Sequence, residues 1–260
     1  MKPEILKFDF KQQLDKPDTL DLYIYSEVAP DGFDWWSRET IPSETSANFF
    51  REKLTEYNNV KFINLYINSV GGSVVEGYGI YAQLKRHEAY KTVYVDGFAN
   101  SIASVIAMSG NKIIMYQNSV MGIHNMEQGC FGNAVAHRQC ADNLDSMMEG
   151  SRQLYLARSG GKITLEKVTE LLDATTILTA QECLEYGFCD EIADAVADPV
   201  KTAAAVQRMN ADMAQQIKYY QTLRQSFSEA MTALIEKKEP GPSDPPPAEN
   251  KTLFAAFMKR

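Results

Sequence analysis

The feature that most restricts the fold of this chain is a regular alternation of short apolar segments and longer helical ones. LDLYIYSEV at 20–28 and KFINLYIN at 61–68 are rich in β-branched and aromatic residues, and a helical pattern follows each of them. Parallel strands need crossover connections, which are usually helices. The sequence therefore predicts an α/β fold of repeated β-α-β units, with helices covering both faces of a parallel sheet.

The same patterns place the other expected elements. Further strands are expected at 91–97, 111–116 and 119–125. Helices are expected at 44–57, 73–88, 132–158, 164–172 and 179–186, with a short one opening at residue 101. These elements place one α/β domain at 18–194, preceded by an N-terminal segment at 1–17.

The composition changes after residue 194. Apolar residues between Met209 and Leu234 recur every three or four positions, which predicts an amphipathic helical extension at 195–238. This extension either folds back on the domain or associates with a second copy. A proline-rich linker follows at 239–250, and a short tail at 251–260 is either disordered or a docking peptide.

Composition excludes several classes of function. The net charge of -8 gives no electrostatic basis for binding nucleic acid. No apolar run approaches the roughly 18 residues of a membrane span, and the N-terminus lacks a signal peptide. The four cysteines form no CxxC pair and the three histidines lack ligand spacing, so we expect reduced thiols, a cytoplasmic setting, no metal and no cofactor.

The turn NSVGGS at 68–73 joins an expected strand to an expected helix. Ser73 and Glu76 fit a capping box, and paired glycines let a ligand approach the main chain. Amides at a helix start favour negative charge, so Gly71 is a candidate donor to an oxyanion. The alternative is a tight turn without a chemical role.

The segment GFANSIASVIAMSG at 97–110 contains three serines. Ser101 follows a strand and opens a helix, where its hydroxyl is exposed and the Ile102 N–H points to the same space. The alternative for Ser101 is a helix N-cap. Ser104 and Ser109 lie deeper in the helix and are expected to bond to backbone or to permit close packing.

A nucleophilic serine needs a base and a carboxylate that orients it. His124 ends the apolar strand SVMGIH and is the candidate base, although a structural histidine is the alternative. His87 and His137 lie at a helix end and on a helix flank. Spacing alone leaves four candidates for the carboxylate, which are Glu170, Asp173, Asp190 and Glu191.

Four segments occur in an order that resembles the Clp protease proteolytic subunit. They are INLYINSVGGSVVEGYGIY, VDGFANSIASVIAMSG, MGIHN and LTAQECLEYGFCDEI, and together they cover about 20–193. The resemblance is closest to the phage and prophage versions known as head maturation or prohead proteases. It implies the fold that this family shares with crotonases, with a long protruding helix after the histidine.

The resemblance also implies roles for individual residues. It places the nucleophile at Ser101, the base at His124, the acid at Asp173 and the oxyanion amides at Gly71 and Ile102. Asp173 is the member that requires a small gap in the alignment. Substrate would bind as an added strand along two backbone segments, which comprise Gly72, Ser73, Val74, Glu127 and Gly129.

Two residues depart from the family pattern. Val70 replaces the usual proline before the glycine pair, and Met126 stands where a proline commonly follows the histidine. Neither position supplies a catalytic atom, so we expect changes in loop rigidity or pocket shape.

The expected function is therefore a serine endopeptidase that processes phage capsid or scaffold proteins, in the bacterial cytoplasm or a procapsid. The resemblance implies a homo-oligomer of rings, which stack through the long helix at 132–158. The chain has no P-loop, so an AAA+ ATPase would be a separate partner. The alternatives are general protein degradation with such an ATPase, a crotonase-like acyl-CoA enzyme, and a non-catalytic assembly protein.

Overall fold

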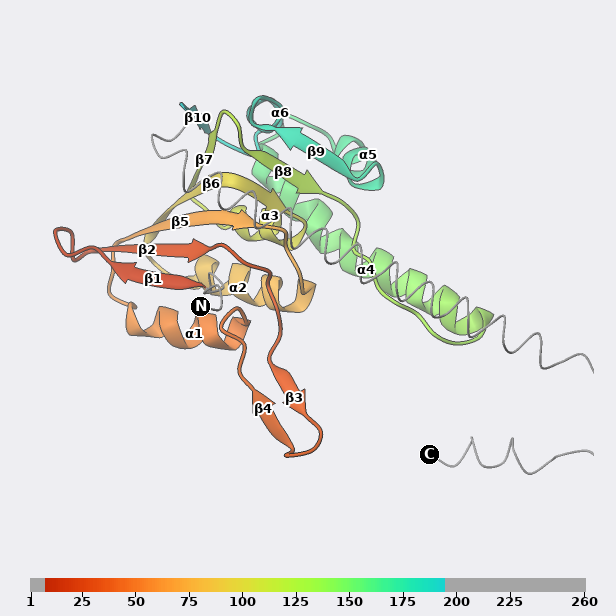
Figure 1. The fold of residues 1–260 in the computed structure, drawn as a ribbon. Helices are drawn as coiled ribbons and strands as arrows, with labels where there is room; N and C mark the ends of the chain where they lie inside the picture. The colour runs from red at the N-terminus through yellow and green to blue at the C-terminus, as the bar shows by residue number, and fades with distance from the viewer. Residues whose placement is uncertain (1–7, 195–260) are drawn as a thin grey trace, which may run out of the picture. The chain divides into compact units, whose positions relative to one another are not determined.

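The computed structural model describes residues 8–194, and Figure 1 shows their fold around one large sheet. The sheet has eight strands in the order β1-β2-β5-β6-β7-β10, while β8 pairs with β6 and β9 pairs with β8. The strands are β1 (Asp9–Gln12), β2 (Thr19–Ile24), β5 (Phe62–Ser69), β6 (Tyr90–Asn100), β7 (Lys112–Tyr116), β8 (Val120–Ile123), β9 (Thr176–Thr179) and β10 (Glu191–Ala193). All neighbours from β2 to β10 along this path are parallel, whereas β1 and β9 pair antiparallel.

The helices follow the expected order along the chain. They are α1 (Ala47–Glu56), α2 (Val74–Arg86), α3 (Ile102–Ala107), α4 (Ala134–Ser159), α5 (Leu165–Asp173) and α6 (Ala180–Tyr186). The α/β class and the long protruding helix are confirmed, since α4 extends away from the sheet (Figure 1). None of the helices in residues 8–194 is long and apolar enough to cross a membrane.

Of the expected domain boundaries, only the N-terminal one, at residue 18, lies within the described residues. β1 pairs with β2 through Asp9 and Tyr23, and Phe8 is buried in the core, so packed structure begins ahead of residue 18. The expected extension at 195–238, linker at 239–250 and tail at 251–260 lie outside the described residues.

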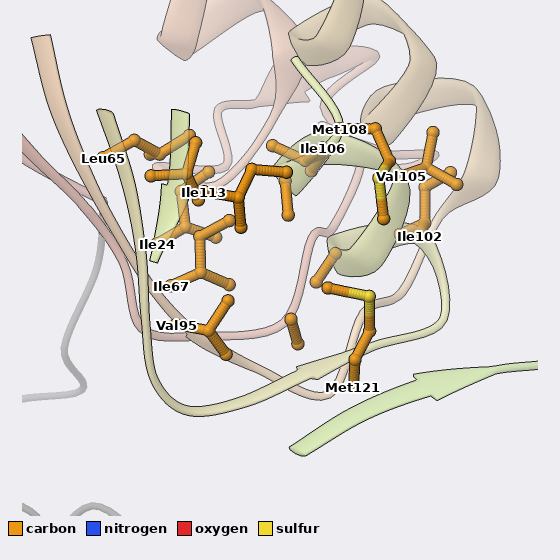
Figure 2. Close-up of a cluster of buried hydrophobic side chains, with 14 of the residues drawn as sticks. Ile24, Leu65, Ile67, Val95, Ile102, Val105, Ile106, Met108, Ile113 and Met121 are labelled. Carbon is orange, nitrogen blue, oxygen red and sulfur yellow. The ribbon is translucent and has the colours of Figure 1, made fainter. Parts of the chain in front are cut away.

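One face of the sheet supplies most of the core. Leu22, Leu65, Val93 and their neighbours are fully buried together with side chains of α1, α2 and α3. Figure 2 shows Ile67, Val95 and Ile113 from the sheet in one buried cluster with Ile106 of α3. The apolar side chains of α3 thus hold this short helix against the strands that precede and follow it.

The opposite face of the sheet differs from the prediction that helices cover both faces. Residues on β2, β5 and β6 alternate between buried and half-buried, and the half-buried side carries Tyr23, Tyr66 and Tyr94. Their rings stack with centroids 4.7 and 5.0 Å apart. Stacked tyrosines therefore form a half-exposed surface where the apolar sequence pattern predicted a second buried layer.

A small hairpin between β2 and α1 was not expected from the sequence. It consists of β3 (Gly32–Asp34) and β4 (Glu39–Ile41), which form a separate two-stranded sheet. Trp35 and Trp36 at its turn are 86% and 97% exposed. Strands of three exposed residues carry no periodic apolar signal, which explains why this hairpin escapes prediction.

Helix α2 packs tightly on α3 at a glycine. A Cβ added at Gly77 would lie 2.0 Å from Cγ1 of Ile102, which is buried at the start of α3. The missing side chain at Gly77 therefore sets how closely α3 can approach α2.

We expect Gly77→Ala to lower the free energy of unfolding by about 1–3 kcal/mol, because the added methyl overpacks the α2–α3 contact. Gly150→Ala is the matched control: its nearest neighbour is the Tyr78 hydroxyl at 3.9 Å, and alanine favours a helix interior. Urea denaturation followed by circular dichroism measures both, and equal stabilities for the two variants would contradict the packing described.

Candidate functional site

The site is built where β6 changes its partner. Residues 92–95 of β6 pair with β7, whereas Phe98, Ala99 and Asn100 pair with β8. Between these stretches the register with β5 shifts, since Ile67 pairs with Val95 but Ser69 pairs with Ala99. This bulge bends β6 and brings the carboxyl ends of β5, β6 and β8 together.

Ser101 occupies a strained junction between β6 and α3. Its φ of 52° and ψ of -129° are unusual for a residue with a side chain. The Ser101 N–H donates to the Gly122 carbonyl at 2.8 Å, which ties the junction to β8. The hydroxyl makes no capping bond, so Ser101 is at the N-cap position without acting as an N-cap through its side chain.

The glycine turn is fixed by a bridge to Val28. The Val28 N–H donates to the Gly71 carbonyl at 2.8 Å, and the Ser73 N–H donates to the Val28 carbonyl at 2.7 Å. In this parallel bridge Val28 bonds to the residues on either side of Gly72, so the N–H and carbonyl of Gly72 are not used in it. Gly72 is exposed.

The N–H of Gly71 was expected to be free to bind an oxyanion, but it is already hydrogen-bonded within the protein. It donates to Ser69 Oγ at 3.1 Å, and that hydroxyl donates to the Ser26 carbonyl at 2.7 Å. Gly71 is also buried, whereas the Gly72 N–H has no protein acceptor among the described residues. The free amide of the turn is therefore that of Gly72.

Gly71 nevertheless defines how the turn meets α3. A Cβ on Gly71 would lie 2.8 Å from Ser101 Cβ and 3.2 Å from the Ile102 nitrogen, so only glycine allows this approach. Its φ of 96° also disfavours other residues. Ile102 is the first residue of α3, where the N–H has no partner within the helix. The turn and the start of α3 thus share one space beside Ser101.

His124 follows β8 directly and is partly buried. Its Nδ1 lies 2.6 Å from the carbonyl oxygen of Asn125. Since a carbonyl only accepts, this contact favours the tautomer with its proton on Nδ1, in which the neutral ring has a lone pair on Nε2. This is the tautomer that can accept a proton from a hydroxyl.

Asp173 reaches the histidine through Asn125. The antiparallel pair Ile123 and Thr176 brings the end of α5 beside the end of β8. Asp173 Oδ1 then accepts from the Asn125 side-chain amide at 2.7 Å. Asn125 was not predicted from the sequence, and its position directly after His124 was the only available signal.

The other residues singled out in the sequence, Ser73, Glu76 and Ser104, have mainly structural contacts. Ser73 caps α2, but Glu76 bonds to the Ala47 N–H at 2.7 Å, so only half of the expected capping box forms. Ser104 is buried and bonds to the Ser101 carbonyl and to Tyr155, as expected for a packing residue.

The two segments predicted to bind substrate lie on opposite sides of Ser101 in the chain. Gly72 is exposed and Val74 is partly buried at the start of α2, whereas Glu127 and Gly129 are exposed in the loop before α4. Both segments therefore have accessible backbone, although no described contact joins them.

The remaining carboxylates and histidines lie outside this group. Asp190 accepts from the Ile113 N–H and pairs with Arg158, and Glu191 pairs with Lys112. His87 ends α2 and His137 is exposed on α4. Within residues 8–194, no three or more His, Cys, Asp or Glu side chains gather as metal ligands do.

A cavity of about 610 Å³ lies at the other end of the strands. It is lined by residues at the amino ends of β2 and β5, among them Thr19 and Phe62. Ser101 and His124 lie at the carboxyl ends of β6 and β8, where ligands of parallel sheets usually bind.

Three comparisons relate the chain to known proteins. The family model described as Clp protease matches residues 42–196. The ATP-dependent Clp protease proteolytic subunit 3 of Rhodococcus jostii is 33% identical over 138 residues, which cover 52% of this chain and 67% of that protein. A solved structure of a ClpP1 mutant from Listeria monocytogenes is 20% identical with a TM-score of 0.54, covering 67% of this chain and 91% of its own.

The strained φ of Ser101 generates a prediction about stability alone. We expect the free energy of unfolding, measured by urea denaturation, to be about 1 kcal/mol higher for Ser101→Gly than for Ser101→Ala, because glycine adopts a positive φ without strain. The alanine variant is the matched control, since both changes remove the hydroxyl. A glycine variant no more stable than the alanine variant would contradict the conformation described for this junction.

Proposed function

The chain belongs to the Clp protease family, whose members are peptidases, and from this premise we propose that it is a serine endopeptidase with Ser101 as nucleophile. The observation that carries the proposal is the Ser101 hydroxyl, which caps nothing at a strained strand-to-helix junction. Strain of this kind is retained where it serves a function. The neighbouring strand β8 leads directly into His124, the proposed base.

In the proposed reaction, Ser101 attacks the peptide carbonyl while Nε2 of His124 takes its proton. His124 then returns the proton to the leaving amine, and water completes the hydrolysis of the acyl-enzyme. The contact between His124 Nδ1 and the Asn125 carbonyl supports this role, because it leaves Nε2 free to act as base.

We assign the oxyanion amides to Gly72 and Ile102 rather than to Gly71 and Ile102. The Gly71 N–H is occupied by Ser69 Oγ, while the Gly72 N–H is not used in the bridge to Val28. Ile102 supplies an unpaired N–H at the start of α3. Each such donor contributes about 3 kcal/mol to lowering the barrier of acyl transfer.

Asp173 acts in this proposal through Asn125, as the acid of a relay. Its carboxylate accepts a hydrogen bond from the Asn125 side-chain amide, and the main-chain carbonyl of Asn125 contacts Nδ1 of the imidazole. Asn125 is therefore a positioning residue, which fixes the ring without touching the reacting atoms. Asp173 keeps the role of the acid implied by the family resemblance.

We further propose that the natural substrates are phage capsid or scaffold proteins, which bind as a strand between 72–74 and 127–129. The motifs shared with phage proteases support this choice. A cytoplasmic homo-oligomer, with α4 at the contact between rings, fits the long exposed stretch of that helix. General degradation with a separate AAA+ ATPase remains the alternative for the substrate class.

The nucleophile is tested by labelling the full chain with a fluorophosphonate probe. We expect the wild type to label and Ser101→Ala to lose all labelling, because the probe bonds only to an activated serine. Ser109→Ala is the matched control in the same segment, since its buried hydroxyl has no partner. Full labelling of Ser101→Ala would overturn the assignment, and an unlabelled wild type would favour a non-catalytic assembly protein or an acyl-CoA enzyme.

The relay is tested by peptide hydrolysis. We expect Asn125→Ala to lower kcat by about tenfold with little change in KM, because the main-chain carbonyl that contacts the imidazole remains but loses the side-chain anchor on Asp173. Asp173→Asn should show a similar loss, and the double variant should lose little more than either single one. Additive losses would show that Asp173 and Asn125 act separately.

A further inference from the structure

Two cysteines meet where the loop after His124 turns into α4. Cys130 is exposed in that loop, and Cys140 lies two turns into the helix with 8% of its surface exposed. Cys140 is the only buried residue of α4 ahead of Met148, although this half of the helix faces outward. Residues outside the hydrophobic core must therefore bury the Cys140 side chain.

The loop between His124 and α4 lies over this part of the helix. The Cys130 thiol donates to the Ala136 carbonyl at 3.8 Å, which places its sulfur over the turn before Cys140. Helical side chains tilt toward the N-terminus, so the Cys140 side chain leans over that same turn. Interaction with the Cys130 side chain raises the pKa of Cys140.

A glycine allows this approach. Gly132 has a φ of 151°, and a Cβ at this position would lie 2.6 Å from the Ala136 Cβ. The loop is held on its other side by the Met126 N–H, which lies 3.2 Å from the Met148 sulfur. Both ends of the segment thus lie against α4, and between them the Cys130 sulfur lies over the turn that precedes Cys140.

We propose that Cys130 and Cys140 are a redox modification site, which forms a reversible intramolecular disulfide and fastens the loop after His124 to α4. The oxidant is a low-molecular-weight disulfide of the glutathione class. The Cys130 thiolate attacks one sulfur of that disulfide, forming a mixed disulfide and releasing one glutathione thiolate. The Cys140 thiolate then attacks the Cys130 sulfur and releases the second glutathione, so the protein loses two electrons and two protons.

The bond would change the loop rather than the core. It would add a covalent attachment at Cys130 to the contacts that already hold this loop through Met126 and the Ala136 carbonyl. Cys183 and Cys189 serve as internal controls, because burial raises the pKa of Cys189 to about 11 and also raises that of Cys183. Cys183 and Cys189 are 0% and 1% exposed, so the oxidant does not reach them, whereas Cys130 is exposed and can attack it first.

The test incubates the full chain with oxidised glutathione, then counts free thiols by alkylation in denaturant and maps the peptides by mass spectrometry. We expect the wild type to lose two thiols, to yield a peptide linked between Cys130 and Cys140, and to recover both thiols after reduction. Cys140→Ser should instead retain glutathione on Cys130. Phe131→Ser, at a fully exposed neighbouring position, should behave as the wild type.

Hydrogen exchange tests the fastening of the loop. We expect amides at 126–133 to exchange about tenfold more slowly in the oxidised wild type, with no change in Cys130→Ser treated in the same way. A stable glutathione adduct on Cys130 of the wild type, or a disulfide between two chains, would overturn the pairing. A linked peptide without slower exchange would overturn the fastening. No peptidase activity is measured, so these outcomes are independent of the proposed function.

Discussion

The candidate site depends on the bulge that lets β6 serve two partners. Up to Val95 the strand pairs with β7, and from Phe98 onward it pairs with β8. A straight strand would keep β7 as its neighbour and leave His124 remote from Ser101. Gly97 lies in the bulge, where a Cβ would come within 2.9 Å of the Asn68 side chain. The bend therefore needs a residue without a side chain at this position.

Much of the fold was predictable because its signals are local. Apolar runs and helical periodicity located each strand from β2 to β8 in the main sheet and every helix of residues 8–194 to within a few residues. Ser101 and His124 were proposed from local position, and each does directly follow a strand. The prediction that helices cover both faces was wrong, because Tyr23, Tyr66 and Tyr94 give an apolar pattern while remaining half-exposed.

The parts that escaped prediction depend on contacts between distant segments. Which glycine amide is free follows from the bridge to Val28 and the Ser69 hydroxyl, and neither is visible in the motif at 68–73. Asn125 enters the site only because β9 returns beside β8 and carries Asp173 to it. The strand β9 has four residues and was not predicted from the sequence. Backbone direction and strand return are properties of the fold rather than of a local pattern.

The β3–β4 hairpin has a practical consequence for spectroscopy of this protein. The chain contains two tryptophans, Trp35 and Trp36, and both lie at the exposed turn of that hairpin. Their indole rings are already in water in the folded state, so their emission will scarcely change when the core melts. Intrinsic tryptophan fluorescence is thus insensitive to unfolding here, but it will respond to anything that covers the hairpin.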